Sequence, residues 1–307
     1  MQPTIEQVRP DRVLTQLTQA YRNPTYIWDQ FFKVIQTGGA ETGQYFIYDQ
    51  EPWFRTEATI VAPGDTPPIS GFSVSKESFK CEEYAICVPL PVRTEKNADP
   101  ALKLRASMAL YTADQVNLRL ETQLASEVFT TGVWGTDYTV ATKWDDPAAR
   151  FLEDISEAKE IIRRKTGREP NTLVLGASVW AKLRFHPDIL EKKKYTKGGA
   201  ATIQDLGEYL ELETILVGRA VYNAAPEGAE PEYKDVWGPH AWLGYVASTP
   251  GPMQPSAGYT IVARPMTTRT WFDEARESTM IKSSVIADFV ITGKNLGVFF
   301  PDVITKA

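Results

Sequence analysis

The chain has 307 residues, of which 43% are hydrophobic and 23% are charged. This composition can bury a large core and excludes an intrinsically disordered chain, and at this length a fold commonly divides into two domains. The formal net charge of −6 argues against a sequence-specific DNA reader, which would present a basic face.

The apolar segments and the cysteines indicate the cellular compartment in which the chain resides. The first twelve residues hold no apolar run, and no later run approaches the ~20 residues of a membrane helix. Cys81 and Cys87 would lie about 20 Å apart on one strand, beyond the ~7 Å between the Cα atoms of a disulfide. We therefore expect a chain that is retained in a cytoplasm and has no membrane partner.

Residues 1–38 contain three prolines and are followed by a glycine pair, so one continuous helix is not expected there. The segment is also rich in aromatic residues. We interpret it as an N-terminal arm that docks through these side chains. The anchors are Tyr26, Trp28, Phe31 and Phe32.

Strand patterns follow from residue 44 to residue 92. They read QYFIYDQ, WFRTEATIVA and FSVSKESFKCEEYAICV, with a proline- and glycine-rich stretch between the last two. This order predicts a long hairpin with a wide tip, stiffened by proline. Half of each arm is polar, so the hairpin would leave open edges and exposed side chains unless a partner covers them. The side chains that need this cover are Trp53, Phe54, Arg55, Ile69 and Phe72.

A long helix is predicted to open at Asp99 and Pro100 and to run to about residue 131, because no glycine or proline interrupts it. Its length would be about 48 Å, against a mean of about 11 to 12 residues for globular helices. Such a rod is typical of a spine under a sheet. Its apolar stripe is Leu102, Ala106, Ala109, Ala113, Val116, Leu120, Leu124 and Val128.

A second region alternates helices and strands. A helix opens at Asp146 and ends at Gly167, the strand TLVLG and another helix follow, and His186-Pro187 stops that helix. The pattern Thr202–Asp205 starts one more helix, which leads to a strand that ends at Gly218. This order predicts a compact α/β unit.

The remaining residues give an exposed tip, NAAPEGAEPEYKD (223–235), and then further strands. The last 40 residues are too few for a core of their own, so we expect them to rejoin the spine helix. The predicted architecture is α+β, with an α/β domain at about 145–264 inserted into a region built from the spine helix and the terminal strands.

No catalytic, cofactor or metal site is predicted. Gly176 ends a strand before a helix, but the stretch has neither the three glycines of a dinucleotide site nor the lysine of a phosphate loop, so we favour packing. The acidic pairs at 145–146 and 273–277 are better explained by helix capping and a turn than by glycoside hydrolysis. His186 and His240 lack ligand spacing and are expected to be structural.

The order of these parts resembles the major capsid proteins of tailed bacteriophages. The resemblance rests on the arm, the hairpin, the spine helix, the stretches NTLVLGASVWAKLRFHPDI and DLGEYLELETILVGRAVYN, and the returning TWFDEARES. That family has the Hong Kong 97-type fold, shared with encapsulin nanocompartments, and the chain is most similar to the lambda-type group.

The resemblance implies a division of the chain into five parts. Residues 1–38 would be the N-arm, 39–92 the E-loop hairpin with its base, 93–144 the peripheral domain with the spine helix, 145–264 the axial domain, and 265–307 the returning strands of the peripheral domain. The aromatic hairpin residues would then contact a neighbouring subunit. The tip at the centre of each capsomer would comprise Pro226, Glu227, Gly228 and Glu230.

The function implied by the resemblance is that of a shell subunit. It would assemble in the host cytoplasm into hexamers and pentamers that enclose double-stranded DNA without sequence-specific binding. A separate scaffolding protein, a portal and decoration proteins are the expected partners, and no Lys–Asn crosslink is predicted. An encapsulin-like compartment and a cytoplasmic α/β hydrolase are the alternatives.

Overall fold

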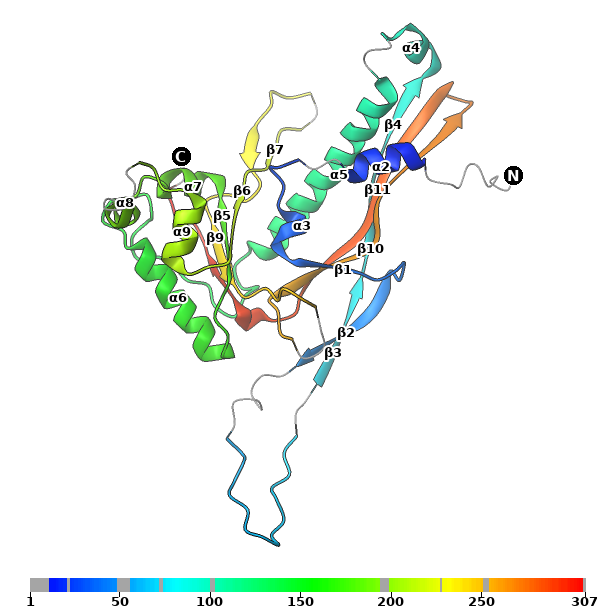
Figure 1. Cartoon of the computed structure of the whole chain (residues 1–307). Coiled ribbons are helices and arrows are strands. Elements are labelled where there is room, and N and C mark those ends of the chain that lie inside the picture. The colour runs from blue at the N-terminus through cyan, green and yellow to red at the C-terminus, as the bar shows by residue number, and fades with distance from the viewer. Residues whose placement is uncertain are drawn as a thin grey trace.

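The computed structural model of the chain describes residues 11–20, 23–48, 56–71, 74–99, 103–193, 199–226, 228–250 and 254–305. An elongated region built on long strands and one long helix joins a more compact α/β region, and an extended loop projects away from both (Figure 1). In the described part of the chain, no helix is both long and apolar enough to cross a membrane.

The sheet of the elongated region has four strands in the order β1-β10-β11-β4. The long strands β10 (Gly258–Asp273) and β11 (Ser278–Ile291) form an antiparallel hairpin. Strand β4 (Glu82–Pro91) pairs antiparallel with β11, and the short β1 (Lys33–Gln36) pairs parallel with β10. Pro265 lies where the register of β10 shifts, a position at which a strand tolerates a residue without an N–H group.

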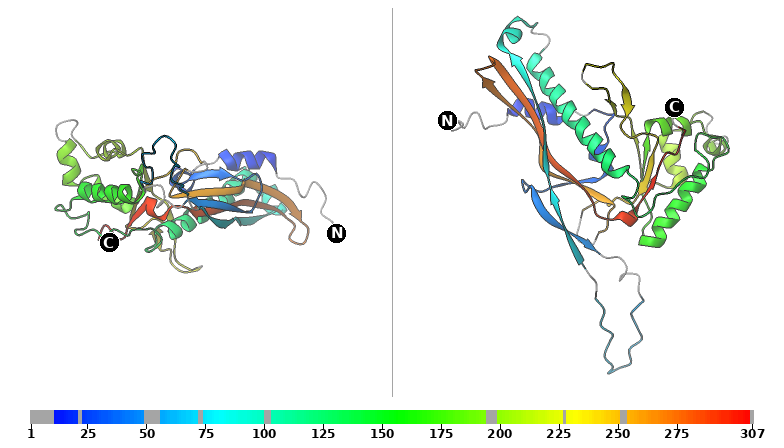
Figure 2. Two further views of the ribbon diagram at one scale, coloured as in Figure 1. Left: turned by 90° about the horizontal axis from the view of Figure 1, so that it is seen from below. Right: turned by 180° about the vertical axis from the view of Figure 1, so that it is seen from behind.

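Helix α5 (Leu104–Val128) is the predicted spine, and it packs along β11 and β4 (Figure 2). Its 25 residues make it about 37 Å long. The predicted stripe is confirmed from Ala109 onward, because every stripe residue from there to the end of the helix is buried.

The predicted start of the spine helix was wrong by about four residues. A short helix, α4 (Val92–Asn97), precedes it, Ala98 is extended, and Lys103 is in the left-handed conformation with φ +42°. The helix begins at Leu104, where its side chain first meets the cluster formed by Leu14, Leu90 and Ile281. Pro100 and Leu102 lie outside the described residues.

The α/β region is built on a second sheet with the order β12-β9-β5-β6. Its central strands are β5 (Thr172–Gly176), which is buried along its whole length, and β9 (Ala241–Gly244). The outer strands are β6 (Thr214–Gly218), parallel to β5, and β12 (Gly297–Phe300), antiparallel to β9.

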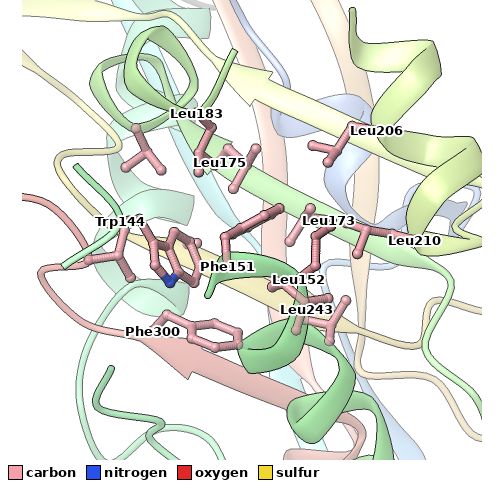
Figure 3. Close-up of a cluster of buried hydrophobic side chains, with 14 of the residues drawn as sticks. Trp144, Phe151, Leu152, Leu173, Leu175, Leu183, Leu206, Leu210, Leu243 and Phe300 are labelled. Carbon is pink, nitrogen blue, oxygen red and sulfur yellow. The ribbon is translucent and has the colours of Figure 1, made fainter. Parts of the chain in front are cut away.

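Four helices accompany this sheet. They are α6 (Phe151–Thr166), α7 (Ala177–Leu183), α8 (Pro187–Lys193) and α9 (Ile203–Leu210). Their apolar faces meet the sheet in a core that includes Trp144, Phe151 and Phe300 (Figure 3). The predicted ends hold, since Gly167 closes α6 in the left-handed conformation and Thr202 forms a capping box with Asp205.

Two boundaries in this region differ from the prediction. Helix α6 begins at Phe151 because Asp146 accepts a hydrogen bond from the Ala148 N–H group (2.9 Å) and closes a turn before the helix. Strand β10 continues past residue 264, which was predicted as the end of the inserted domain. The last strand, β12, lies in the α/β sheet and not in the long-strand sheet, so the chain crosses back once more after β11.

The arms of the predicted long hairpin at residues 44–92 also differ from the prediction. Strands β2 (Thr42–Tyr48) and β3 (Val74–Lys80) form the antiparallel stem, and the predicted strand at 53–62 is absent over its described part, residues 56–62. Residues 56–71 instead form an extended loop that points away from the body (Figure 2).

Candidate assembly surfaces

The loop at residues 56–71 is exposed along its whole length. Two of its aliphatic side chains have almost no contact with the rest of the chain, since Ile60 is 104% exposed and Ile69 is 97% exposed, whereas Val61 is 39% exposed. A backbone hydrogen bond from Asp65 N to Ala62 O closes only a local turn. The loop therefore offers apolar side chains and open backbone groups to another molecule.

The stem of this loop is fixed to the body, although the loop is not. The Lys80 N–H group donates to Asp288 on β11 (3.1 Å), and Cys81 N donates to Glu41 O (2.7 Å). Phe79 packs against a small cluster that includes Cys81 and Ile286. Burial raises the pKa of Asp288, which indicates a partly desolvated anchor. The base of the loop thus has a fixed position on the long-strand sheet.

The sequence predicted five contact residues in this hairpin. Ile69 is exposed as expected, while Trp53, Phe54, Arg55 and Phe72 lie outside the described residues. Ile60 was missed because its segment read as a strand, in which an isoleucine has an expected place against a sheet. The prolines at 63, 67 and 68 come after this segment, and they correctly marked only residues 62–71 as the tip.

The described part of the arm contains two short helices, α2 (Arg12–Ala20) and α3 (Trp28–Phe31), followed by strand β1. Its predicted anchors dock on the same subunit. Phe31 and Phe32 are fully buried beside Trp242, and Phe31 stacks on Trp237 with ring centroids 5.6 Å apart.

The other two anchors also contact the same chain. The Tyr26 hydroxyl donates to Asp114 on α5 (3.3 Å), and Trp28 packs at the edge of the same cluster. Helix α2 lies along β10, where the Thr15 hydroxyl group and the Thr268 backbone exchange hydrogen bonds. Residues 11–38, as far as they are described, therefore dock on the body of the same subunit.

The predicted tip is a small hairpin of β7 (Val221–Asn223) and β8 (Tyr233–Asp235). The Asn223 side chain accepts hydrogen bonds from the N–H groups of Ala225 and Glu232 and orders the turn. Of the four predicted tip residues, Pro226, Gly228 and Glu230 are exposed, and Glu227 lies outside the described residues.

The acidic and histidine residues that could suggest chemistry have structural partners. Asp145 accepts from Thr305 N, Asp273 accepts from Ala275 N, and His186 is buried with its Nε2 3.0 Å from Asp146 O. The His240 ring accepts from Asp302 N (2.9 Å). The described residues contain no group of three or more His, Cys, Asp or Glu side chains that could hold a metal ion.

A groove between α6 and α9 is lined by charges of both signs, among them Lys159, Glu160, Arg163 and Glu211. Lys159 donates to the backbone oxygen of Leu210, the last residue of α9, and burial lowers the pKa of Lys159. Glu160 is bonded to Arg163 and Arg164. These side chains thus serve as bridges between the two helices and along α6.

Comparison with known proteins gives the family. The family described as "Phage major capsid protein E" matches residues 135–233. The major capsid protein of Burkholderia phage BcepMu is 27% identical over 262 residues, covering 82% of each chain. The major capsid protein of Pseudomonas phage JBD67 is 30% identical over 237 residues, covering 75% of each chain. This chain belongs to the phage major capsid protein family.

Solved structures agree with this assignment. A phage-related protein from Bordetella bronchiseptica is 25% identical, with a TM-score of 0.74 over 96% of this chain and 97% of the other. A structure titled Mycobacterium phage Bobi has a TM-score of 0.57 over 98% of this chain and 95% of the other at 14% identity, which shows the fold alone. The predicted Hong Kong 97-type capsid fold is confirmed, and the function is that of a shell-forming major capsid protein.

Proposed function

We propose that the loop at residues 56–71 lies across a neighbouring subunit and closes the shell. The observation that carries this proposal is the exposure of Ile60 and Ile69 on a loop whose stem is fixed to the body. Water would surround both side chains in an isolated subunit, and burying each in an interface stabilises it by roughly 1.5–3 kcal/mol. Obligate interfaces of this kind bury about 2,000 Å² or more.

We also propose roles for the two regions of the subunit, with β12 counted in the α/β region because it lies in that sheet. The long-strand sheet and the spine helix serve as the peripheral domain, and the α/β region serves as the axial domain. The exposed hairpin tip at 224–232 converges with its copies at the centre of hexamers and pentamers. Its exposure and its place beside the α/β sheet support this role (Figure 1).

The shell encloses double-stranded DNA and is assembled in the bacterial cytoplasm with a separate scaffolding protein, a portal and decoration proteins. The net charge of −6 supports a wall that holds DNA loosely, because each neutralised phosphate would strengthen binding. A protein-filled compartment is the second candidate. A virus-like particle from Pyrococcus furiosus has a TM-score of 0.58 at 13% identity, a likeness of fold alone. Extraction of nucleic acid and protein from purified particles separates the two.

The loop contact is tested by replacing Ile60 and Ile69 together with serine. We expect a folded subunit with an unchanged melting temperature, because neither side chain is buried in it, and a loss of closed shells by light scattering and negative-stain microscopy. Thr66→Ala on the same exposed loop is the matched control and should assemble normally. Replacing residues 60–71 with a short glycine-containing turn should give the same loss. Normal shells from both altered proteins would overturn the proposal.

A further inference from the structure

A buried carboxyl group joins three segments that are far apart in the sequence. Glu121 lies on the spine helix and is 0% exposed. Its oxygens accept hydrogen bonds from the backbone N–H groups of Ile27 (3.0 and 3.1 Å) and Trp28 (2.8 Å), 94 and 93 residues away. One of these oxygens also accepts from the indole Nε1 of Trp237 (2.5 Å), 116 residues away.

The partners of Glu121 belong to elements of different kinds. Ile27 and Trp28 are at the start of α3, where the arm meets the spine helix, and their N–H groups have no partner within a helix that begins there. Trp237 comes two residues after the end of β8, at the base of the exposed hairpin, and its ring stacks on Phe31 of the arm. The arm and the hairpin base therefore meet at one acidic side chain.

In the described part of the chain, only N–H groups stabilise the negative charge of the Glu121 carboxylate. The nearest acidic group that affects it is Asp29 on α3, whose charge opposes ionisation of Glu121. Asp114, two turns earlier on α5, accepts from Asn23 and Tyr26, and Glu127 further along α5 accepts from Gln123. On the Trp237 side, Asp235 is exposed and the His240 ring accepts from Asp302 N. In the described part of the chain no cation contributes to the pKa of Glu121.

These contacts make the two attachments dependent on each other. When Trp237 moves away, the Glu121 carboxylate loses one of its hydrogen-bond donors but stays buried. The free energy of the state in which the arm is seated therefore rises. When the arm moves away, water reaches the carboxylate and the Trp237 contact weakens in turn. We propose that Glu121 is a switchable junction through which the N-terminal arm and the base of the β7–β8 hairpin are seated or released together.

The junction is expected to respond to pH, with a defined sign. Burial raises the pKa of the seated Glu121 to about 7, although its N–H donors lower it, whereas the released group returns to its ordinary value near 4.5. The seated state thus binds the proton more tightly. The protonated group favours seating most below pH 4.5. This preference falls by up to about tenfold in the equilibrium per pH unit between 4.5 and 7, and it levels off above pH 7.

The proposal is tested on the full chain by hydrogen exchange with mass spectrometry between pH 6 and 8.5, in one oligomeric form checked by light scattering. Protection factors, which remove the intrinsic effect of pH on exchange, are compared for segments 23–32 and 233–243. In the unaltered protein we expect both to fall together by about tenfold between pH 6 and pH 8, with most of the fall below pH 7.5 and little further change up to pH 8.5. Glu121→Gln, which cannot ionise, should give flat profiles, and Glu127→Gln on the same helix should keep the original ones.

A double-mutant cycle tests the coupling itself. Trp237→Phe keeps a ring against Phe31 but removes the indole donor, so it should lower the protection of segment 23–32 when Glu121 is present and change it little in the Glu121→Gln background. An equal effect in both backgrounds, or two segments that respond at different pH values, would overturn the proposal. If Glu121→Gln does not fold, Trp237→Phe alone decides, because it must lower protection at segment 23–32 and shift its pH midpoint.

Discussion

Gly176 at the end of β5 has no room for a side chain. A Cβ atom there would lie 2.0 Å from the carbonyl oxygen of Gly238, and the Gly176 N–H group donates to His240 O (3.1 Å). The sequence correctly predicted packing at this glycine. The close neighbour is the loop at Gly238, some 60 residues further along the chain, which no local pattern shows.

This contact gives a prediction at a single residue. Gly176→Ala should destabilise the subunit by about 3 kcal/mol, because a backbone carbonyl cannot move aside as a flexible side chain can. Gly207→Ala is the matched control, since its Cβ atom would have 3.4 Å to the nearest atom and alanine favours a helix such as α9. Thermal unfolding measures both. An unchanged melting temperature for Gly176→Ala would contradict the close approach.

The spine helix shows how far an element can be predicted from its sequence. Its apolar stripe was predictable because spacings of three and four residues fix which face is buried. The beginning was not, because Asp99-Pro100 is a good local start signal and the contacts of Leu104 with Leu14, Leu90 and Ile281 come from distant parts of the chain. Glu121 was missed for the same reason, since its donors come from residues 27, 28 and 237.

Val116 tests the buried face of the helix. Val116→Asp would place a carboxylate without a partner among the buried apolar side chains that surround Val116. This should lower the free energy of unfolding by about 3–5 kcal/mol. We expect insoluble protein or a melting temperature lower by roughly 6 °C or more. Tyr111→Asp, on the exposed side of the same helix, should leave both unchanged. A soluble Val116→Asp variant that melts like the original would mean that this face is not buried.

At the scale of the whole molecule, the order of the parts was predictable although their boundaries were not. The hairpin, spine and inserted α/β region follow each other in the sequence as in the fold. The return of β12 to the α/β sheet could not be predicted, because GVFF suits a buried strand in either sheet. In the loop at 56–71, the proline-rich tip at 62–71 was predictable, whereas residues 56–62 read as a strand because threonine, isoleucine and valine favour that structure.

The central claim is that a neighbouring subunit covers the loop at residues 56–71. Hydrogen exchange of this loop tests the claim directly. Dissociated subunits and purified shells of the same chain are labelled for the same times, with segment 172–176, buried in the core of both, as the internal reference. We predict exchange at nearly the intrinsic rate in subunits and protection of at least about tenfold in shells, because a neighbouring subunit covers the loop. Equally fast exchange in both forms would contradict the account.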